Sequence, residues 1–305
     1  MPAPATTTDE LLTVRDWLRY AVSRFNAAQL VYGHGTANAL DEAAYLILHT
    51  LHLPVDQLEP WLEARLLGGE RQAVREIIEA RITTRKPAPY LTHEAWIGGH
   101  AFYVDERVIV PRSYIGELLT DQLAAAAGEW HLGHNPGPVA AILDLCTGSG
   151  CLAILAALAF PQAVVDASDV SIDALAVAAR NVADYGLEAR ISLSQSNLFE
   201  AHAGRRYDLI LANPPYVAAE ALAAFPPEYA AEPQIAHAGG VDGLDLVRRI
   251  LAEAGAYLAQ TGALLVEIGA GREPLAAQFQ SLPFRWLDTA DSVAQVFALP
   301  ATALP

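Results

Sequence analysis

The chain has 305 residues, enough for one large domain or for a large and a small one, and 53% of them are hydrophobic, so a sizeable core can form. Its 19 Lys and Arg residues against 35 Asp and Glu residues give a formal net charge of -16. Such a surface repels phosphate backbones and attracts basic proteins, which argues against direct nucleic-acid binding and for a strongly basic protein partner.

The cysteine content, the first residues and the apolar runs argue against several further classes of protein. Cys146 and Cys151 are too few for a disulfide scaffold or a zinc site, and we expect both to be small buried residues. The first residues, MPAPATTTDELLTV, lack the basic and then apolar segments of a secretory signal. The longest apolar run, residues 151–160, is too short to span a bilayer. We therefore expect a cytoplasmic protein that makes no membrane contact.

Residues 1–90 predict a small helical domain. Thr7 and Glu10 have the spacing of a capping box and precede apolar residues at helical intervals. A second helix is expected to begin near Asn38, and a third covers residues 70–86, where prolines follow.

Residues 91–138 predict a hairpin and a connecting helix. Two short aromatic and β-branched runs flank Gly98-Gly99, a pair that accepts the positive φ angles of a tight turn. A helix is expected over residues 113–127. His131 and His134 follow in a Gly- and Pro-rich loop without carboxylate or cysteine partners at ligand spacing, so we expect no metal site.

Residues 139–305 alternate between apolar strand-like runs and helical segments. This alternation predicts a doubly wound α/β domain with a mostly parallel sheet. The expected strands lie near residues 139–145, 163–169, 189–195, 207–213 and 263–269, with two more near Phe284 and Val293.

A glycine-rich turn follows the first of these strands. In LDLCTGSGCLA, Gly148, Gly150 and Ala153 stand at G-x-G-x-x-A spacing. Glycines let the backbone approach a ligand, and the N–H groups at the start of the next helix point at an anionic part of it. The pattern fits a dinucleotide dehydrogenase, an S-adenosylmethionine-dependent methyltransferase, or a tight turn with no ligand.

Two acidic residues favour the methyl donor among these. Asp169 ends the second strand, where a carboxylate can accept hydrogen bonds from ribose hydroxyls. Asp144 lies on the first strand, where it would repel a pyrophosphate but suit the ammonium group of S-adenosylmethionine. The alternative is that both residues merely cap helices.

The fourth strand ends in Asn213-Pro214-Pro215-Tyr216. Because ligands of open α/β sheets bind at the carboxyl edge, this tetrad should lie beside the glycine turn. The Asn213 side-chain carbonyl and the Pro214 backbone carbonyl are two rigid acceptors for the hydrogens of a planar –NH2 group, and Tyr216 offers a flat face for stacking. Such a site suits methylation of an amide or exocyclic amine, because it stabilises the positive charge that develops on nitrogen and needs no strong base.

On these motifs the chain resembles the protein-glutamine N5-methyltransferases and, more distantly, the adenine-N6 DNA methyltransferases. Residues 86–112 (KPAPYLTHEAWIGGHAFYVDERVIVPR) and 226–251 (PPEYAAEPQIAHAGGVDGLDLVRRIL) are also similar to stretches of the glutamine-modifying enzymes. They are most similar to the branch that methylates the third protein of the large ribosomal subunit, rather than the branch that methylates peptide-chain release factors.

The resemblance implies roles for the three parts of the chain. Residues 1–90 would recognise the substrate, 91–138 would connect, and 139–305 would hold the catalytic domain of the Rossmann-like methyltransferase type. The donor would be S-adenosylmethionine, with no metal, and the partner a basic protein of the large ribosomal subunit.

The resemblance also implies the site residues. The expected donor contacts are Asp144, Cys146, Thr147, Gly148, Gly150, Asp169, Asn197, Leu198 and Asn213. The expected glutamine contacts are Asn213, Pro214, Pro215 and Tyr216, of which Asn213, Pro214 and Tyr216 would be catalytic. Many relatives carry glycine where Cys146 stands, and an aspartate and an aromatic residue where Asn197 and Leu198 stand.

Other functions stay open at this point. Release-factor methylation would use the same site, whereas adenine-N6 methylation of DNA would need a positive groove that this acidic chain does not predict. A non-catalytic ribosome-assembly module would predict a damaged glycine turn or tetrad, and both are intact. Glu228 and Glu232, in the loop after the tetrad, are expected to face solvent or the partner rather than to act as bases.

Overall fold

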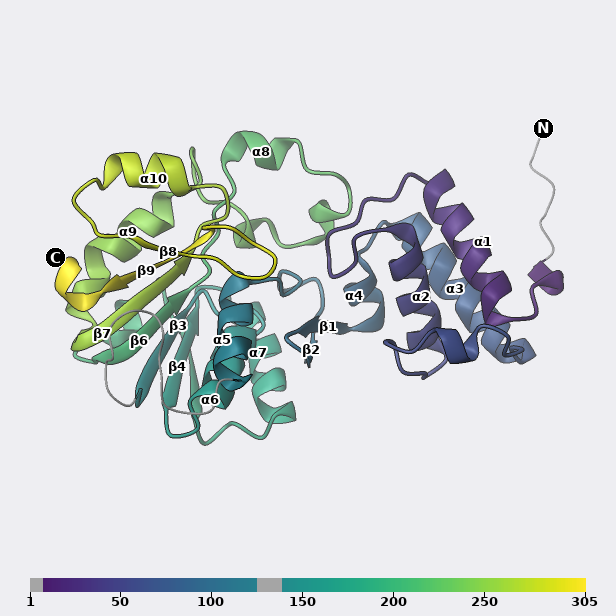
Figure 1. Cartoon of the computed structure of the whole chain (residues 1–305), viewed down its shortest axis with the longest axis horizontal. Coiled ribbons are helices and arrows are strands. Elements are labelled where there is room, and N and C mark those ends of the chain that lie inside the picture. Colours follow the sequence, from purple (N-terminus) through teal and green to yellow (C-terminus); the bar gives the residue numbers. More distant parts are fainter. Residues whose placement is uncertain (1–7, 125–138) are drawn as a thin grey trace. The chain divides into compact units, whose positions relative to one another are not determined.

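The computed structural model describes residues 8–124 and 139–305, which form two compact units (Figure 1). The helical unit comprises Met1–Glu94 together with Pro226–Ala231, and the sheet unit comprises Ala95–Phe225 together with Glu232–Pro305. Within the described ranges, no helix combines the length and apolar character that a membrane span requires.

The helical unit packs its helices around an apolar core. The second and third helices lie where the sequence predicts them: Asn38 caps one of them, and Pro87 follows the other. The helices are α1 (Val14–Ala27), α2 (Ala39–Thr50), α3 (Gly68–Thr84) and α4 (Ala88–Thr92). The core is dominated by large buried side chains, among them Trp17, Phe25, Leu46, Ile47 and Ile78.

The start of the first helix differs from the prediction. Thr7 lies outside the described residues, and Thr8–Glu10 forms a 3-10 turn. The capping box is instead made by Thr13 and Asp16: the Asp16 N–H donates to Thr13 Oγ1 at 3.2 Å, and the Thr13 N–H donates to Asp16 Oδ2 at 2.8 Å. The helix begins there because its buried face begins at Val14.

The predicted hairpin is confirmed. Strands β1 (Glu94–Ile97) and β2 (His100–Tyr103) pair about Gly98 and Gly99, whose φ angles are 55° and 79°. Helix α5 (Tyr114–Ala124) follows, and residues 125–127 of the expected helix lie outside the described part of the chain.

The sheet unit contains a seven-stranded sheet of order β5-β4-β3-β6-β7-β9-β8. Its first five strands in this order are parallel, whereas β9 runs antiparallel to β7 and to β8. The predicted strands and the mostly parallel α/β class are confirmed. The strands are β3 (Ala141–Leu145), β4 (Val164–Asp169), β5 (Ile191–Gln195), β6 (Tyr207–Ala212), β7 (Leu258–Glu267), β8 (Arg285–Leu287) and β9 (Val296–Pro300).

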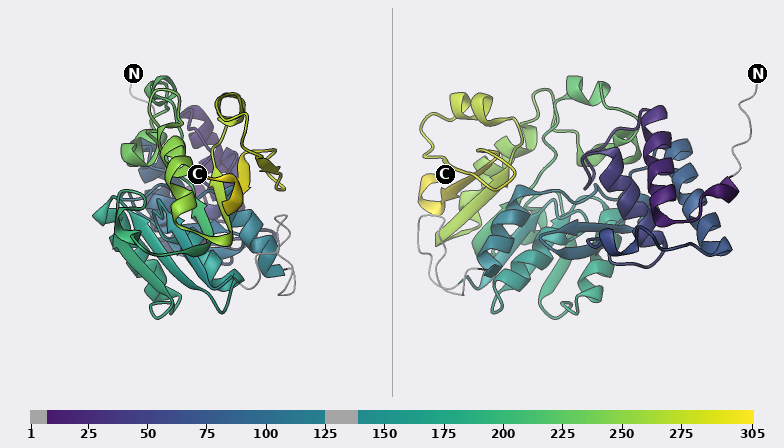
Figure 2. Two further views of the ribbon diagram at one scale, coloured as in Figure 1. Left: turned by 90° about the vertical axis from the view of Figure 1, so that its left-hand side faces the viewer. Right: turned by 45° about the vertical axis from the view of Figure 1, so that its right-hand side comes forward.

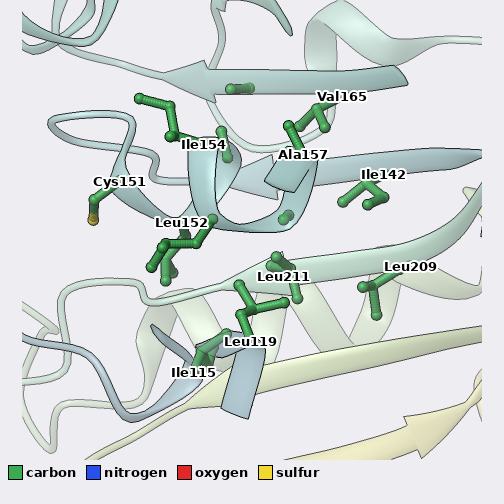
Figure 3. Packing of buried hydrophobic residues seen from close by; sticks show 14 of the residues in the cluster. Ile115, Leu119, Ile142, Cys151, Leu152, Ile154, Ala157, Val165, Leu209 and Leu211 are labelled. Atoms are coloured by element: carbon green, nitrogen blue, oxygen red, sulfur yellow. The ribbon is translucent and has the colours of Figure 1, made fainter. Parts of the chain in front are cut away.

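Helices cover both faces of this sheet (Figure 2). Successive residues of a strand point to opposite faces of the sheet. Leu209 and Leu211 pack with α6 in the core on one face (Figure 3), while Ile210 packs in the core on the opposite face. Helices α5, α6 (Cys151–Ala159) and α7 (Ile172–Asp184) lie on one side, and α9 (Asp245–Glu253) and α10 (Arg272–Gln278) on the other. The short helix α8 (Ala219–Ala223) and 3-10 turns at Glu59–Trp61, Glu200–His202, Tyr229–Ala231, Gln234–Ala236, Ala254–Ala256 and Ala301–Ala303 complete the elements.

The strand order fixes where a ligand can bind. From β3 the chain builds β4 and then β5 on one side, and after β5 it crosses over to place β6 on the other side of β3. A crevice forms at the carboxyl ends of the strands at such a switch point. The glycine turn, Asp169 and the Asn213 tetrad each follow or end one of these three strands.

Candidate functional site

A cavity of about 510 Å³ opens in the sheet unit at this switch point. It gathers residues that the sequence predicted from four separate segments: Cys146, Gly148, Asp169, Asn197, Leu198, Asn213 and Pro215. The remaining predicted residues, Asp144, Thr147, Gly150, Pro214 and Tyr216, belong to the same segments but do not line the cavity.

Asp144 is fully buried beneath the glycine turn. Its Oδ2 accepts the Thr147 hydroxyl at 2.5 Å and the Ala153 N–H at 3.1 Å, which fixes the turn to the helix after it. Its Oδ1 has no hydrogen-bond partner among the described residues. Burial raises the pKa of Asp144 to about 7. A cationic group bound at Oδ1 would offset the desolvation of this carboxylate.

The backbone of the turn explains its glycines. Gly148 and Gly150 have φ angles of 55° and 80°, and a Cβ at Gly150 would lie 3.1 Å from Ala178 Cβ on α7. Cys146 also has a positive φ, 58°. Glycine would adopt this conformation without strain, which is the physical reason a relative can carry glycine at this position.

Asp169 joins the glycine turn to α7. Its Oδ2 accepts the Gly148 N–H at 3.0 Å, and its Oδ1 accepts the Ser171 N–H at 2.9 Å. Burial raises its pKa despite these hydrogen bonds. Each oxygen keeps a second lone pair, and the residue lines the cavity, so Asp169 can accept hydroxyl groups there.

Asn197 and Leu198 form another part of the cavity wall. The Asn197 amide is held at both ends, because its Nδ2 donates to Glu200 at 2.8 Å and its Oδ1 accepts from Arg249 at 3.0 Å. Leu198 is buried, with a φ of 55°. The wall here is therefore an apolar side chain beside an amide that is already oriented.

The tetrad leaves β6 with Asn213 and Pro215 facing the cavity. The Tyr216 hydroxyl donates to Glu267 Oε1 at 3.2 Å. Gly269 leaves room for the Tyr216 ring, because a Cβ at this glycine would lie 2.7 Å from it. Burial, and then the negative charge of Glu267, raise the pKa of Tyr216, so the phenol stays protonated.

Glu267 is a supporting residue that the sequence reasoning missed. This buried carboxylate also accepts the Ser113 hydroxyl at 2.7 Å and the Tyr114 N–H at 2.9 Å, which joins the start of α5 to the tetrad. Burial raises its pKa. A single acidic residue at the end of the apolar run LLVE was the available signal.

The expectation that Glu228 and Glu232 face solvent or a partner is wrong. Both are buried. In the sheet unit, Glu232 accepts two hydrogen bonds from Arg112, at 2.8 and 2.7 Å, and one from the Val110 N–H at 2.9 Å, while His237 Nε2 lies 2.9 Å from its Oε2. The loop after the tetrad folds back onto earlier parts of the chain, and its glutamates neutralise arginines there.

Further cavity residues come from segments to which no role was assigned. They are Arg107, Val108 and Ile109 before α5, Pro233, Ile235, Ala236, Ala238, Gly239 and Gly240 in the loop after the tetrad, and Asp245 and Leu246 at the start of α9. All three segments lie in the stretches 86–112 and 226–251 that carried the family resemblance. The resemblance therefore pointed to these segments, but it did not show that they meet at the cavity.

His131 and His134 lie outside the described residues. Across residues 8–124 and 139–305, no three His, Cys, Asp or Glu side chains gather as metal ligands would.

The strain at Cys146 makes a testable prediction. Glycine at this position should relieve about 1 kcal/mol of backbone strain, partly offset by the greater freedom of glycine in the unfolded chain. Cys146→Ala is the matched control, because it removes the sulfur and keeps the Cβ at positive φ. We expect the glycine variant to melt roughly 1–3 °C above the alanine variant by circular dichroism. A glycine variant that melts below the alanine variant would show that the turn is not strained.

Comparison with known proteins places the chain in a family. Residues 131–225 match the family model described as Methyltransferase small domain. The chain is 58% identical over 290 residues to the ribosomal protein uL3 glutamine methyltransferase of Bordetella pertussis, with 95% of each chain covered, and 54% identical over 300 residues to that of Burkholderia pseudomallei, with 96% of each covered.

A solved structure with the same fold is the hMettl16 catalytic domain in complex with MAT2A 3'UTR hairpin 1. It has a TM-score of 0.50 and 17% identity, over 85% of this chain and 90% of that one. The fold is thus that of the Rossmann-like methyltransferases. With its sequence similarity to the curated enzymes covering nearly the whole length, the chain belongs to the family of ribosomal protein uL3 glutamine methyltransferases.

Proposed function

We propose that this protein transfers a methyl group from S-adenosylmethionine to the side-chain amide nitrogen, N5, of a glutamine in ribosomal protein uL3. The observation that carries the proposal is the placement of Asn213 and Pro215 in the same cavity as the glycine turn and Asp169. An amide-binding corner and a donor-binding turn then face each other, in a chain 58% identical to a uL3 glutamine methyltransferase.

The residues that line the cavity, together with the buried Asp144, fit the donor. The buried Asp144 oxygen without a partner suits the donor ammonium, the oxygens of Asp169 suit the ribose hydroxyls, and Leu198 with Asn197 offers an apolar and an amide surface for the adenine. The donor supplies an electrophilic methyl group when it is bound.

The tetrad prepares the substrate nitrogen. A carboxamide nitrogen is a poor nucleophile because its lone pair is delocalised. The Asn213 side-chain carbonyl and the Pro214 backbone carbonyl accept its two hydrogens, which favours the pyramidal nitrogen and stabilises the charge that develops on it. The two prolines hold these acceptors in place, so little reorganisation is required during the reaction.

Tyr216 completes the substrate site. Glu267 orients the phenol through its hydroxyl, and the ring provides a flat surface for the planar amide. No side chain is needed as a strong base, because a methylated amide nitrogen that carries positive charge loses its proton readily to water.

Charge supports a basic ribosomal protein as the substrate. A net charge of -16 favours encounter with a cationic protein and disfavours a nucleic-acid backbone, which makes adenine-N6 methylation of DNA the weaker alternative. Release-factor methylation would use the same chemistry, but the high identity to uL3 enzymes over nearly the whole chain favours uL3. A ribosomal-protein substrate also favours activity in the cytoplasm, away from membranes.

Removal of the Asn213 acceptor tests the tetrad. Asn213→Ala should lower turnover of uL3 at least about a hundredfold, the scale of losing one contact that stabilises developing charge. Binding of S-adenosylmethionine, measured by calorimetry, should stay within about twofold if the lost contact acts on the substrate amide. Turnover close to that of the wild type would exclude this role.

The pH dependence of donor binding tests Asp144. Its pKa is about 7, so the carboxylate gains charge as the pH rises through 7, and attraction to an ammonium group grows with it. Between about pH 6 and pH 7.5, where the donor α-amino group remains mostly protonated, affinity should rise severalfold. Asp144→Asn should bind more weakly and lack this rise. The same pH profile in both proteins would assign the titration to another group.

Salt should weaken encounter with the basic substrate. We expect the KM for intact uL3 to rise several-fold between about 50 and 500 mM salt, because screening shortens the range of the attraction. The control is a short neutral peptide with the same glutamine, whose KM should change little. Equal salt profiles for protein and peptide would remove the electrostatic contribution.

A further inference from the structure

The loop that follows Tyr216 is held in both units of the chain. Its ends meet in the sheet unit, where Val217 and Ala238 form a β-bridge and the Val217 N–H donates to the His237 carbonyl at 2.9 Å. Its middle, Pro226–Ala231, folds as part of the helical unit. We call residues 217–238 the tethered loop. Pro233 and Ile235, which follow the middle segment, line the cavity.

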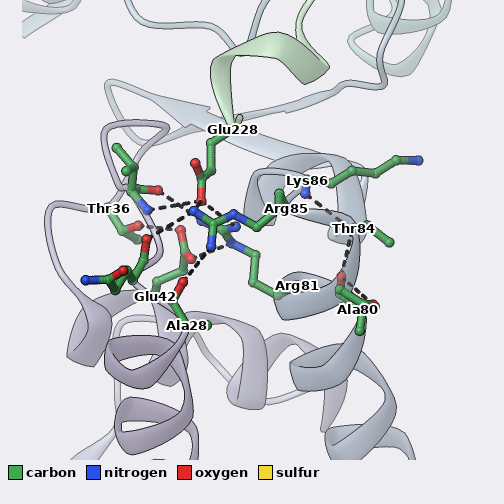
Figure 4. Close-up of polar contacts among 12 residues, drawn as sticks. Ala28, Thr36, Glu42, Ala80, Arg81, Thr84, Arg85, Lys86 and Glu228 are labelled. Carbon is green, nitrogen blue, oxygen red and sulfur yellow. Dashed lines mark hydrogen bonds and ion pairs between the residues drawn. The ribbon is translucent and has the colours of Figure 1, made fainter. Parts of the chain in front are cut away.

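Glu228 holds the middle of the tethered loop. It is 0% exposed, and its Oε1 accepts the Val31 N–H at 3.1 Å. The same oxygen forms an ion pair with Arg85, whose Nη2 lies 2.8 Å away (Figure 4). Arg81 Nη1 lies 3.7 Å from the same oxygen. A buried carboxylate without cations would be costly, so these two arginines define one position for Glu228.

Within this ion cluster, the charges of the two arginines are matched only when Glu228 is in place. Arg81 is fully buried, and it donates to Glu42 Oε1 at 2.7 Å and to the Val31 carbonyl at 3.0 Å. Glu42 is the other buried carboxylate of the cluster, so Glu228 and Glu42 together match Arg81 and Arg85. If Glu228 left, two arginines would share one carboxylate.

Tyr229 adds a shape-specific contact beside this ion cluster. Its ring lies 4.3 Å from the His34 ring between centroids. Gly33 has a φ of 124°, and a Cβ there would lie 2.6 Å from the Tyr229 hydroxyl oxygen. The missing side chain of Gly33 therefore lets the Tyr229 hydroxyl approach the backbone closely, which supports a specific rather than a chance attachment.

We propose that Glu228 is a positioning residue that fastens the tethered loop to the helical unit and thereby orders the loop residues that receive the protein substrate. The inference rests on the proposed function. Loop residues 232–238 start one residue after the anchored segment, so anchoring limits the conformations available to Pro233 and Ile235 beside Asn213. Glu228 touches neither substrate nor donor in this role.

The experiment compares Glu228→Gln with Glu42→Gln. Each variant removes one buried carboxylate charge from the same arginine cluster, but only Glu228 belongs to the tethered loop. We expect Glu228→Gln to raise the KM for uL3 at least about tenfold, the scale of one charge-assisted hydrogen bond, with donor affinity within about twofold. Glu42→Gln should change KM by less than about threefold at a comparable loss of melting temperature.

Hydrogen exchange provides a readout that needs no substrate. Amides of residues 217–238 should exchange faster in Glu228→Gln than in the wild type or in Glu42→Gln. Equal KM changes in the two variants, or unchanged exchange in the loop, would overturn the proposal and leave Glu228 a stabilising residue only. If the wild type fails to methylate uL3, the proposed function falls, and the exchange comparison still decides whether Glu228 anchors the loop.

Discussion

Strand β6 lies between β3 and β7 in the middle of a sheet, and two consecutive prolines end it because neither can donate a ladder hydrogen bond. The chain must leave the sheet at Asn213, at the carboxyl edge where the strand order reverses. This constraint brings Asn213 and Pro215 into the cavity that Cys146 and Gly148 of the glycine turn also line. The proposed chemistry depends on it, because rigid acceptors would need little ordering before they hold an amide.

Buried glutamates then hold the segments around this corner. Residues 110–114 form one clamp: the Val110 N–H and Arg112 bind Glu232 at the far end of the tethered loop, while Ser113 and the Tyr114 N–H bind Glu267, which orients Tyr216. Each of these carboxylates accepts hydrogen bonds from several donors. They therefore fix the conformation of loops that hydrophobic packing alone would leave variable.

The two units do not follow one another simply along the sequence. The sheet unit contains the cavity and the tetrad, while the helical unit takes in six residues from the far side of the tetrad as part of its own fold. Glu228 fits there because Arg81 and Arg85 are already held by Glu42 and by backbone carbonyls of residues 28, 29 and 31. The middle of the tethered loop therefore belongs to the fold of the helical unit, although its two ends lie in the sheet unit.

The sequence alone determined the parallel α/β class, the strands, the hairpin and the part of the cavity wall that lies at the strand ends. These features follow from hydrophobic periodicity and from Gly and Pro positions, which act over a few residues, and parallel strands bring their ends to one edge of the sheet. It misplaced the first capping box because Thr7 and Thr13 carry the same local signal, and only burial of Val14 selects between them. The burial of Glu228 and Glu232, and the hydrogen bond from Tyr216 to Glu267, were decided by tertiary structure. Glu228 meets Val31 across 197 residues, and no local pattern encodes a contact between segments so far apart.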